Sequence, residues 1–270
     1  MIKIAICQNK AVTDRDATLN RACEMIREAA ANGADFAVLP EMFICPYSPR
    51  WFRRCVEMGH QLIVDTLSAL AKELGIYIVG GSIPESADGK VYNTCFIFDR
   101  EGRLIARHRK MHLFDSDVCG VPIKESDTFT PGDSITVFDT EFGKMGCAVC
   151  YDIRFPEVFR AMAERGARIV FLPAQFNMVS GPHHWAPMLR TRACDYQYFF
   201  VGAAAARNED FKYQCYGHSL VIDPFGDVLA MGEDGEEIVY ADVDLSRIDE
   251  VRATLPNTKC VRRDIYNVAE

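Results

Sequence analysis

The stretch GADFAVLPEMF, residues 33–43, returns as GARIVFLPAQF at residues 166–176, with five of the eleven positions identical. In both copies a glycine ends a helical pattern and precedes an apolar run of strand length that contains a proline. A helix followed by a buried strand at two places predicts two similar halves of the chain. The copies differ after the proline, where Glu41 in the first corresponds to Ala174 in the second.

The same order of elements surrounds both copies. In the first half we expect strands at 2–7, 35–39 and 76–79, helices at 16–31 and 61–74, and a hairpin of 92–98 and 104–107. In the second half we expect strands at 137–138, 145–149, 168–172, 199–205 and 216–222, and helices at 156–165 and 184–196. Alternating strands and helices predict a layered α/β fold. Two pseudo-equivalent halves, each a sheet with helices on its outer face, predict a four-layer αββα sandwich. No low-complexity linker separates them, so we expect residues 1–270 to form a single domain.

Composition narrows the class of protein. The 270 residues are 49% hydrophobic and 25% charged, which is typical of a globular protein and excludes disorder, collagen and coiled coil. The net charge is −8 and no Lys/Arg-dense segment is interleaved with aromatics, which argues against nucleic acid as a partner. No apolar run approaches the roughly 18 residues of a membrane helix, and no signal peptide is recognisable. We expect a cytoplasmic protein with a small-molecule substrate and no membrane partner.

The cysteines favour a reducing compartment and not a disulfide framework. There are eleven, an odd number, and most lie in apolar runs. Cys147 and Cys150 form Cys-x-x-Cys, but residues three apart on a strand point to opposite faces, and no second ligand pair has convincing spacing. His108 and His112 lie in a cationic segment that would repel a dication. We therefore expect neither a metal ion nor a cofactor.

Cys150 occupies the position of a nucleophile. It ends the apolar run 145–149 and precedes a turn and a helix, a setting that projects a side chain from a sheet and leaves backbone N–H groups facing an anion. A buried small hydrophobe is an equal interpretation of this cysteine. The base that activates it is either a histidine or a buried carboxylate such as Glu41, assisted by a cation such as Lys110. The candidate histidines are His183, His184 and His218.

Three segments resemble the motifs of the nitrilase superfamily, the carbon–nitrogen hydrolases: LPEMF at 39–43, RKMHLF at 109–114 and CAVCYDIRFPE at 147–157. Within the superfamily, HLFD at 112–115, Glu125-Ser126, FNMVSGPHHW at 176–185 and GHS at 217–219 resemble the omega-amidase branch. Deaminated glutathione amidases share several of these segments. The resemblance implies an αββα sandwich that assembles as a homodimer or a larger homo-oligomer.

The resemblance also implies roles for individual residues. Cys150 would be the nucleophile, Glu41 its general base, Lys110 the cation, and Glu125 a second carboxylate that holds Lys110 and the substrate nitrogen. The developing oxyanion would be stabilised by Lys110 and the backbone N–H of Tyr151. Substrate contacts would come from Arg154, which would pair with a carboxylate, and from Asn177 as a second polar contact. The aromatic residues Phe43, Tyr151, Phe176 and Trp185 are either walls of the pocket or part of the core.

The implied reaction is hydrolysis of a short monoamide of a dicarboxylic acid, such as 2-oxoglutaramate or succinamate, through a thioester with release of ammonia. Other amidases of the superfamily, which act on deaminated glutathione or N-carbamoyl amino acids, remain alternatives. A nitrilase is less favoured by the omega-amidase-like segments. A non-catalytic binding protein is disfavoured because Glu41, Lys110, Glu125 and Cys150 are all present.

Overall fold

The computed structural model describes residues 1–117 and 122–266, which form two large sheets and a small one. The first sheet consists of β15 (Glu237–Val243), β1 (Ile2–Gln8), β2 (Phe36–Val38), β3 (Tyr77–Val79), β5 (Lys90–Phe98) and β4 (Ile83–Ala87) in that spatial order, with β6 (Leu104–Arg109) paired to β5. The second consists of β14 (Val228–Met231), β13 (Leu220–Ile222), β12 (Phe199–Ala204), β11 (Ile169–Ala174), β10 (Gly143–Cys147) and β9 (Thr136–Thr140). A small ribbon pairs β7 (Asp115–Ser116) with β8 (Ile123–Lys124).

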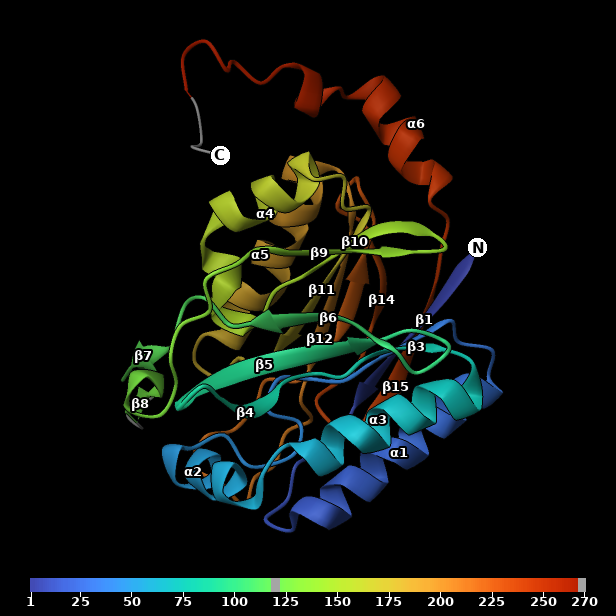
Figure 1. Ribbon diagram of the computed structural model, residues 1–270. Coiled ribbons are helices and arrows are strands. Elements are labelled where there is room, and N and C mark those ends of the chain that lie inside the picture. Colours follow the sequence, from blue (N-terminus) through green and yellow to red (C-terminus); the bar gives the residue numbers. More distant parts are fainter. Residues whose placement is uncertain (118–121, 267–270) are drawn as a thin grey trace.

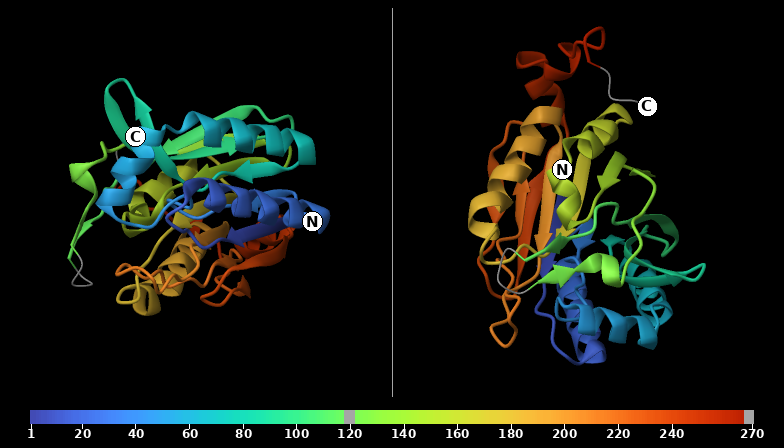
Figure 2. Two further views of the ribbon diagram at one scale, coloured as in Figure 1. Left: turned by 90° about the horizontal axis from the view of Figure 1, so that it is seen from below. Right: turned by 90° about the vertical axis from the view of Figure 1, so that its left-hand side faces the viewer.

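Helices cover the outer faces of both large sheets (Figures 1 and 2). The α-helices are α1 (Arg15–Ala31), α2 (Pro49–Met58), α3 (Gln61–Leu74), α4 (Pro156–Glu164), α5 (Gly181–Tyr196) and α6 (Ser246–Thr254), and the short 3-10 helices are η1 (Glu125–Asp127), η2 (Cys150–Arg154) and η3 (Asn257–Lys259). Helices α1 and α3 pack on the first sheet, and α5 packs on the second with α4 beside it. The predicted αββα sandwich is thereby confirmed.

The side chains of strand β1 show where the two hydrophobic cores lie. Successive side chains of a strand point to opposite faces. Ile4 and Ile6 join the core between the two sheets, whereas Ala5 and Cys7 join the core beneath α1 and α3. Both faces of the strand are therefore buried, which is the usual environment of a parallel strand covered by helices on one side.

The repeat found in the sequence is also present in the topology. In the first sheet β1, β2 and β3 are parallel, and β15 and β5 flank them in antiparallel fashion. In the second sheet β10, β11 and β12 are parallel, and β9 and β13 flank them in antiparallel fashion. Gly33 and Gly166, which follow the equivalent helices α1 and α4, both have positive φ, at 80° and 92°. That backbone conformation favours glycine, which explains why both copies begin with it.

The structure contains elements that the sequence did not predict. It adds α2, β4, β7, β8, β14, β15 and α6, which the local pattern did not reveal. Among them β15 depends on pairing with the distant β1, whereas the other added strands pair with segments nearby in the chain. The expected strand 216–222 is reduced to β13, because Gly217 and His218 adopt φ of 74° and 61° and interrupt the extended backbone. Helix α6 lies at the edge of the molecule in Figure 1, where Ile248 is buried in the core and the carbonyl of Leu255 accepts a hydrogen bond from Gln197 Nε2. In the described part of the chain, no helix has both the length and the apolar character needed to cross a bilayer.

Candidate active site

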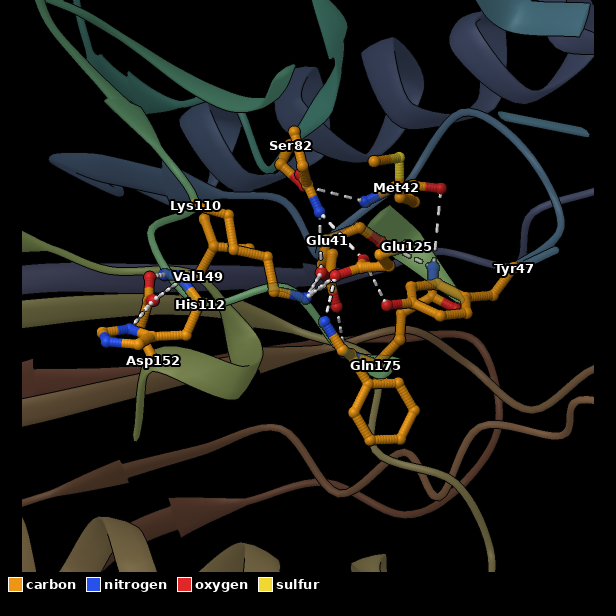
Figure 3. A network of polar contacts seen from close by, with 12 residues as sticks. Glu41, Met42, Tyr47, Ser82, Lys110, His112, Glu125, Val149, Asp152 and Gln175 are labelled. Carbon is orange, nitrogen blue, oxygen red and sulfur yellow. Dashed lines mark hydrogen bonds and ion pairs between the residues drawn. The ribbon is translucent and has the colours of Figure 1, made fainter. Parts of the chain in front are cut away.

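Lys110 lies between two carboxylates in the interior of the protein (Figure 3). Its Nζ is 2.9 Å from Glu41 Oε1 and 2.9 Å from Glu125 Oε2, and all three side chains are fully buried. Glu41 follows β2, Lys110 follows β6 and Glu125 begins η1, so three separate segments meet here. The backbone N–H of Lys110 extends the β5–β6 ladder by donating to the carbonyl of Asn93 at 2.8 Å. The predicted cation and both predicted carboxylates are thus brought together.

The electrostatics of the cluster keep Lys110 charged and make Glu41 a better base. Burial lowers the pKa of Lys110, but the two carboxylates outweigh burial and raise the pKa well above its usual range. For Glu41, burial raises the pKa, the Lys110 ammonium lowers it, Glu125 raises it again, and the balance is upward. A carboxylate with a raised pKa accepts a proton more readily.

Cys150 is the first residue of η2 and follows the end of β10. Its φ is 45°, a conformation that non-glycine residues seldom adopt and that turns the chain sharply from strand to helix. Its side chain belongs to the core between the sheets and is only 7% exposed. The N–H of Tyr151, next in the chain, has no acceptor among the described residues, as is usual in a first helical turn.

Glu41 and Lys110 act on the thiol in opposite directions. Burial and the charge of Glu41 raise the pKa of Cys150 well above its usual range, while the Lys110 ammonium and the backbone N–H of Gln175 lower it. The thiol is therefore neutral at rest, with a carboxylate beside it that can take its proton and an ammonium that can stabilise the sulfur or oxygen anion formed next.

Three neutral residues that the sequence analysis did not identify hold the carboxylates in place. Asn93 Nδ2 donates to Glu41 Oε1 at 2.9 Å, and the Tyr47 hydroxyl donates to Glu125 Oε1 at 2.7 Å. The backbone N–H of Gln175 donates to Glu41 Oε2 at 3.1 Å. The one available signal concerned Gln175, which is adjacent to Ala174, the counterpart of Glu41 in the repeat.

A pocket with about 220 Å³ of empty volume opens onto Cys150. Its lining residues are Phe114, Cys150, Tyr151, Arg154, Gln175, Phe176, Ser180 and Tyr213. The guanidinium carbon of Arg154 lies 5.5 Å from the ring centroids of both Tyr151 and Phe176, and Nη2 is 3.2 Å from His184 Nδ1. No carboxylate of residues 1–117 or 122–266 forms an ion pair with Arg154. The pocket therefore contains a guanidinium whose charge is not balanced by a carboxylate of the described residues.

Three of the expected substrate contacts do not line this pocket. Phe43 is completely buried in the core beneath α1 and α3, because it follows Glu41 into the interior of the first half. Trp185 is buried behind Phe176, at 5.1 Å between ring centroids, and its Nε1 donates to the carbonyl of His218 at 2.7 Å. Asn177 Oδ1 instead accepts the N–H groups of Val179 and Ser180, fixing the turn before α5. The other two aromatic residues considered for the wall, Tyr151 and Phe176, do line the pocket, together with Phe114 and Tyr213.

The histidine alternative for the base has no geometric support. His183, His184 and His218 are all described, and none of them lines the pocket that contains Cys150. His218 Nδ1 lies 2.8 Å from the carbonyl oxygen of Tyr216, and His184 contacts Arg154. Over the described ranges, no group of three or more His, Cys, Asp or Glu side chains is arranged to hold a metal ion.

Comparison with known proteins shows to which family the chain is related. Residues 3–253 match the carbon-nitrogen hydrolase family. The chain is 43% identical over 269 residues to omega-amidase NIT2-A of Xenopus laevis, covering 99% of this chain and 98% of that protein. It is 42% identical over 267 residues to omega-amidase NIT2 of Homo sapiens, covering 98% and 97%. The crystal structure of Saccharomyces cerevisiae Nit3, a member of branch 10 of the nitrilase superfamily, superposes with a TM-score of 0.89 at 40% identity, covering 97% of this chain and 96% of that one.

The chain therefore belongs to the carbon–nitrogen hydrolase family, the nitrilase superfamily to which its motifs are similar. It is an enzyme that hydrolyses amides.

Proposed function

We propose that this enzyme hydrolyses the terminal amide of a short substrate that also carries a carboxylate, such as 2-oxoglutaramate or succinamate. The observation that carries the proposal is Arg154, a guanidinium with no carboxylate partner among the described residues, in the same pocket as Cys150. Its planar fork suits a substrate carboxylate. The relatives named omega-amidase support the same substrate class.

In the first half of the reaction Glu41 takes the proton of Cys150, and the sulfur attacks the amide carbon. The carbonyl electrons move to oxygen, where Lys110 and the backbone N–H of Tyr151 stabilise the negative charge. The tetrahedral species collapses, the carbon–nitrogen bond breaks, and Glu41 gives its proton to the leaving nitrogen. Ammonia departs and a thioester remains on Cys150. Glu125 contributes by holding Lys110, at 2.9 Å.

In the second half Glu41 takes a proton from water, and the hydroxide attacks the thioester carbon. The carbon–sulfur bond breaks, and the departing thiolate recovers the proton from Glu41. The carboxylic acid is released and the enzyme returns to its resting state. The same carboxylate acts twice as base and twice as acid, which suits a raised pKa.

The size of the pocket favours a short substrate. The empty space at the pocket is about 220 Å³ even with open solvent included, so the part that a ligand can fill is smaller still. Four aromatic side chains, those of Phe114, Tyr151, Phe176 and Tyr213, form much of the wall. A five-carbon amide suits this space better than deaminated glutathione does.

Ammonia release across a substrate panel tests the proposal. The panel contains 2-oxoglutaramate and succinamate, the uncharged butyramide as a size-matched control, deaminated glutathione, N-carbamoyl amino acids and a simple nitrile. We expect kcat/KM to be highest for the two short carboxylate-bearing amides. A preference for butyramide or deaminated glutathione over both would overturn the substrate class.

We propose further that residues 1–270 form one domain. We also propose that the protein acts in the cytoplasm as a homodimer or larger homo-oligomer. Neither nucleic acid nor a membrane is a partner in this proposal. Ten cysteines are free thiols, which favours a reducing compartment, and Cys119 lies outside the described residues. The net charge of −8 disfavours nucleic acid. Light scattering on the purified protein measures the assembly, and a monomeric mass would contradict the oligomer.

A further inference from the structure

Asp152 makes contacts that its motif alone did not explain. Its side chain is fully buried and accepts four hydrogen bonds. Oδ2 is 2.9 Å from His108 Nε2 and 3.0 Å from the backbone nitrogen of Val149. Oδ1 is 2.7 Å from His112 Nδ1 and 3.0 Å from the backbone nitrogen of His112. Figure 3 shows Val149 and His112 converging on this carboxylate.

These contacts connect the two segments that carry the reacting groups. His108 and His112 lie two residues before and two residues after Lys110. Val149 and Asp152 lie on either side of Cys150, on the turn from β10 into η2. The segments belong to different sheets, since β6 pairs in the first sheet and β10 in the second. Asp152 therefore bridges the sheets next to the active site.

We propose that Asp152 is a positioning residue that sets the distance between the Lys110 ammonium and the Cys150 sulfur. The inference rests on the proposed function, in which that distance determines stabilisation of the oxyanion. Each oxygen of Asp152 binds one group from a histidine side chain and one backbone N–H, so the carboxylate fixes backbone as well as side chains. Asp152 itself does not line the pocket and acts through its neighbours.

The charge of Asp152 supports this role. Burial alone would raise the pKa of Asp152, but the hydrogen bonds from His108 and His112 outweigh burial and hold the pKa well below its usual range. The group therefore remains an acceptor at both oxygens. On the exposed side the His112 ring stacks on Phe155, at 3.6 Å between centroids, which fixes the ring that Oδ1 binds.

Asp152→Asn is the principal test, because the amide nitrogen has no free lone pair. Whichever way the amide turns, one backbone N–H, of Val149 or of His112, loses its acceptor. We expect kcat for succinamate to fall roughly 10- to 100-fold while KM changes less than about threefold, since displacement by about 1 Å costs that much. Alkylation of Cys150 by iodoacetamide, followed by peptide mass, is expected to slow in parallel.

Asp99→Asn is the matched control. Asp99 is also buried, at 4% exposure, and accepts from the N–H of Glu101 at 3.0 Å and from Arg103 N and Nε at 2.9 and 2.7 Å. These contacts lie within the turn between β5 and β6, away from the pocket. Asp99→Asn is expected to lower the melting temperature and leave kcat and the alkylation rate unchanged.

His112→Phe provides a second variant if Asp152→Asn does not fold. Phenylalanine keeps the stack on Phe155 and the backbone hydrogen bond, and removes only the Nδ1 contact. We expect a smaller fall of both kcat and the alkylation rate. The proposal is overturned if Asp152→Asn, or His112→Phe where Asp152→Asn does not fold, keeps both rates within about twofold of the wild type. If the wild type releases no ammonia from any amide, the proposed function fails, and the alkylation rate alone still decides the role of Asp152.

Discussion

Gln175 holds Glu41 at two points: its backbone N–H donates to the Glu41 carboxylate at 3.1 Å, and its side-chain Nε2 donates to the Glu41 carbonyl at 2.6 Å. Gln175 follows β11 and Glu41 follows β2, the equivalent strand of the other half. Its side-chain oxygen accepts from the Cys215 thiol at 3.0 Å, and its carbonyl accepts from the Tyr213 hydroxyl at 2.6 Å. The opposite half of the molecule thus helps to position the base, together with Asn93 and Lys110 of the first half.

Cys150→Ala is expected to abolish ammonia release while leaving the fold intact. The substitution removes the sulfur that forms the thioester and retains a side chain that fits the same buried space. Ammonia release and circular dichroism measure the two effects. Retention of even a tenth of the wild-type activity would contradict the role of Cys150 as nucleophile.

Lys110→Met is expected to abolish activity and to cost about 3–5 kcal/mol of unfolding free energy. The reason is that Glu41 and Glu125 would remain buried without their shared cation. Urea denaturation measures the loss. The double variant Lys110→Met with Glu125→Gln removes one buried charge and is expected to recover part of the stability but none of the activity. A single variant as stable as the wild type would show that the carboxylates do not depend on Lys110.

Arg154→Lys is expected to raise KM for succinamate by roughly 10- to 100-fold, because a hydrogen bond to a charged group contributes about 1.5–3 kcal/mol and lysine lacks the planar fork. KM for butyramide is expected to change little. Arg190→Lys is the control, since Arg190 lies outside this pocket and donates to the carbonyl of Gly226 at 2.8 Å. Equal effects of Arg154→Lys on the two substrates would refute carboxylate recognition.

The pH dependence of kcat/KM is expected to show an acid limb with its midpoint above the ordinary glutamate value of about 4.3. Glu41 works as a base only when ionised, so activity rises with pH as the group loses its proton. Burial raises the pKa of Glu41 and Glu125 raises it further against Lys110. Glu125→Gln removes a negative charge and is therefore expected to move the midpoint down. A midpoint that moves up in this variant would exclude Glu41 as the titrating base.

Local sequence patterns were sufficient to predict elements whose ends are marked by capping residues. Helix α1 begins after Asp14, whose side chain caps the N–H groups of Asp16 and Ala17, and the chain leaves it through Asn32 and Gly33. The prediction of 16–31 is therefore within one residue of the observed start. By contrast, β15 was missed because its stability comes from pairing with β1, at the other end of the chain.

The candidate site likewise contains some residues that the sequence predicted and others that it did not. Glu41 and Cys150 were identified because each follows an apolar run of strand length, Lys110 because it lies in a cationic segment, and Glu125 only through the family resemblance. Asn93, Tyr47 and Gln175 are neutral, and their contribution depends on folding that places them against the carboxylates. Side-chain direction also could not be read from sequence, which left Phe43 and Trp185 as either wall or core; both are buried in the structure.

The pairing of β1 with β15 imposes an order on biosynthesis. Strand β1 is synthesised long before β15, yet one of its edges has no partner until residues 237–243 have been made. Until then that edge presents open N–H and C=O groups beside Ile2, Ile4 and Ile6, an arrangement that invites association with other chains. A chain that ends before β15 is therefore expected to aggregate and not to fold into a smaller amidase.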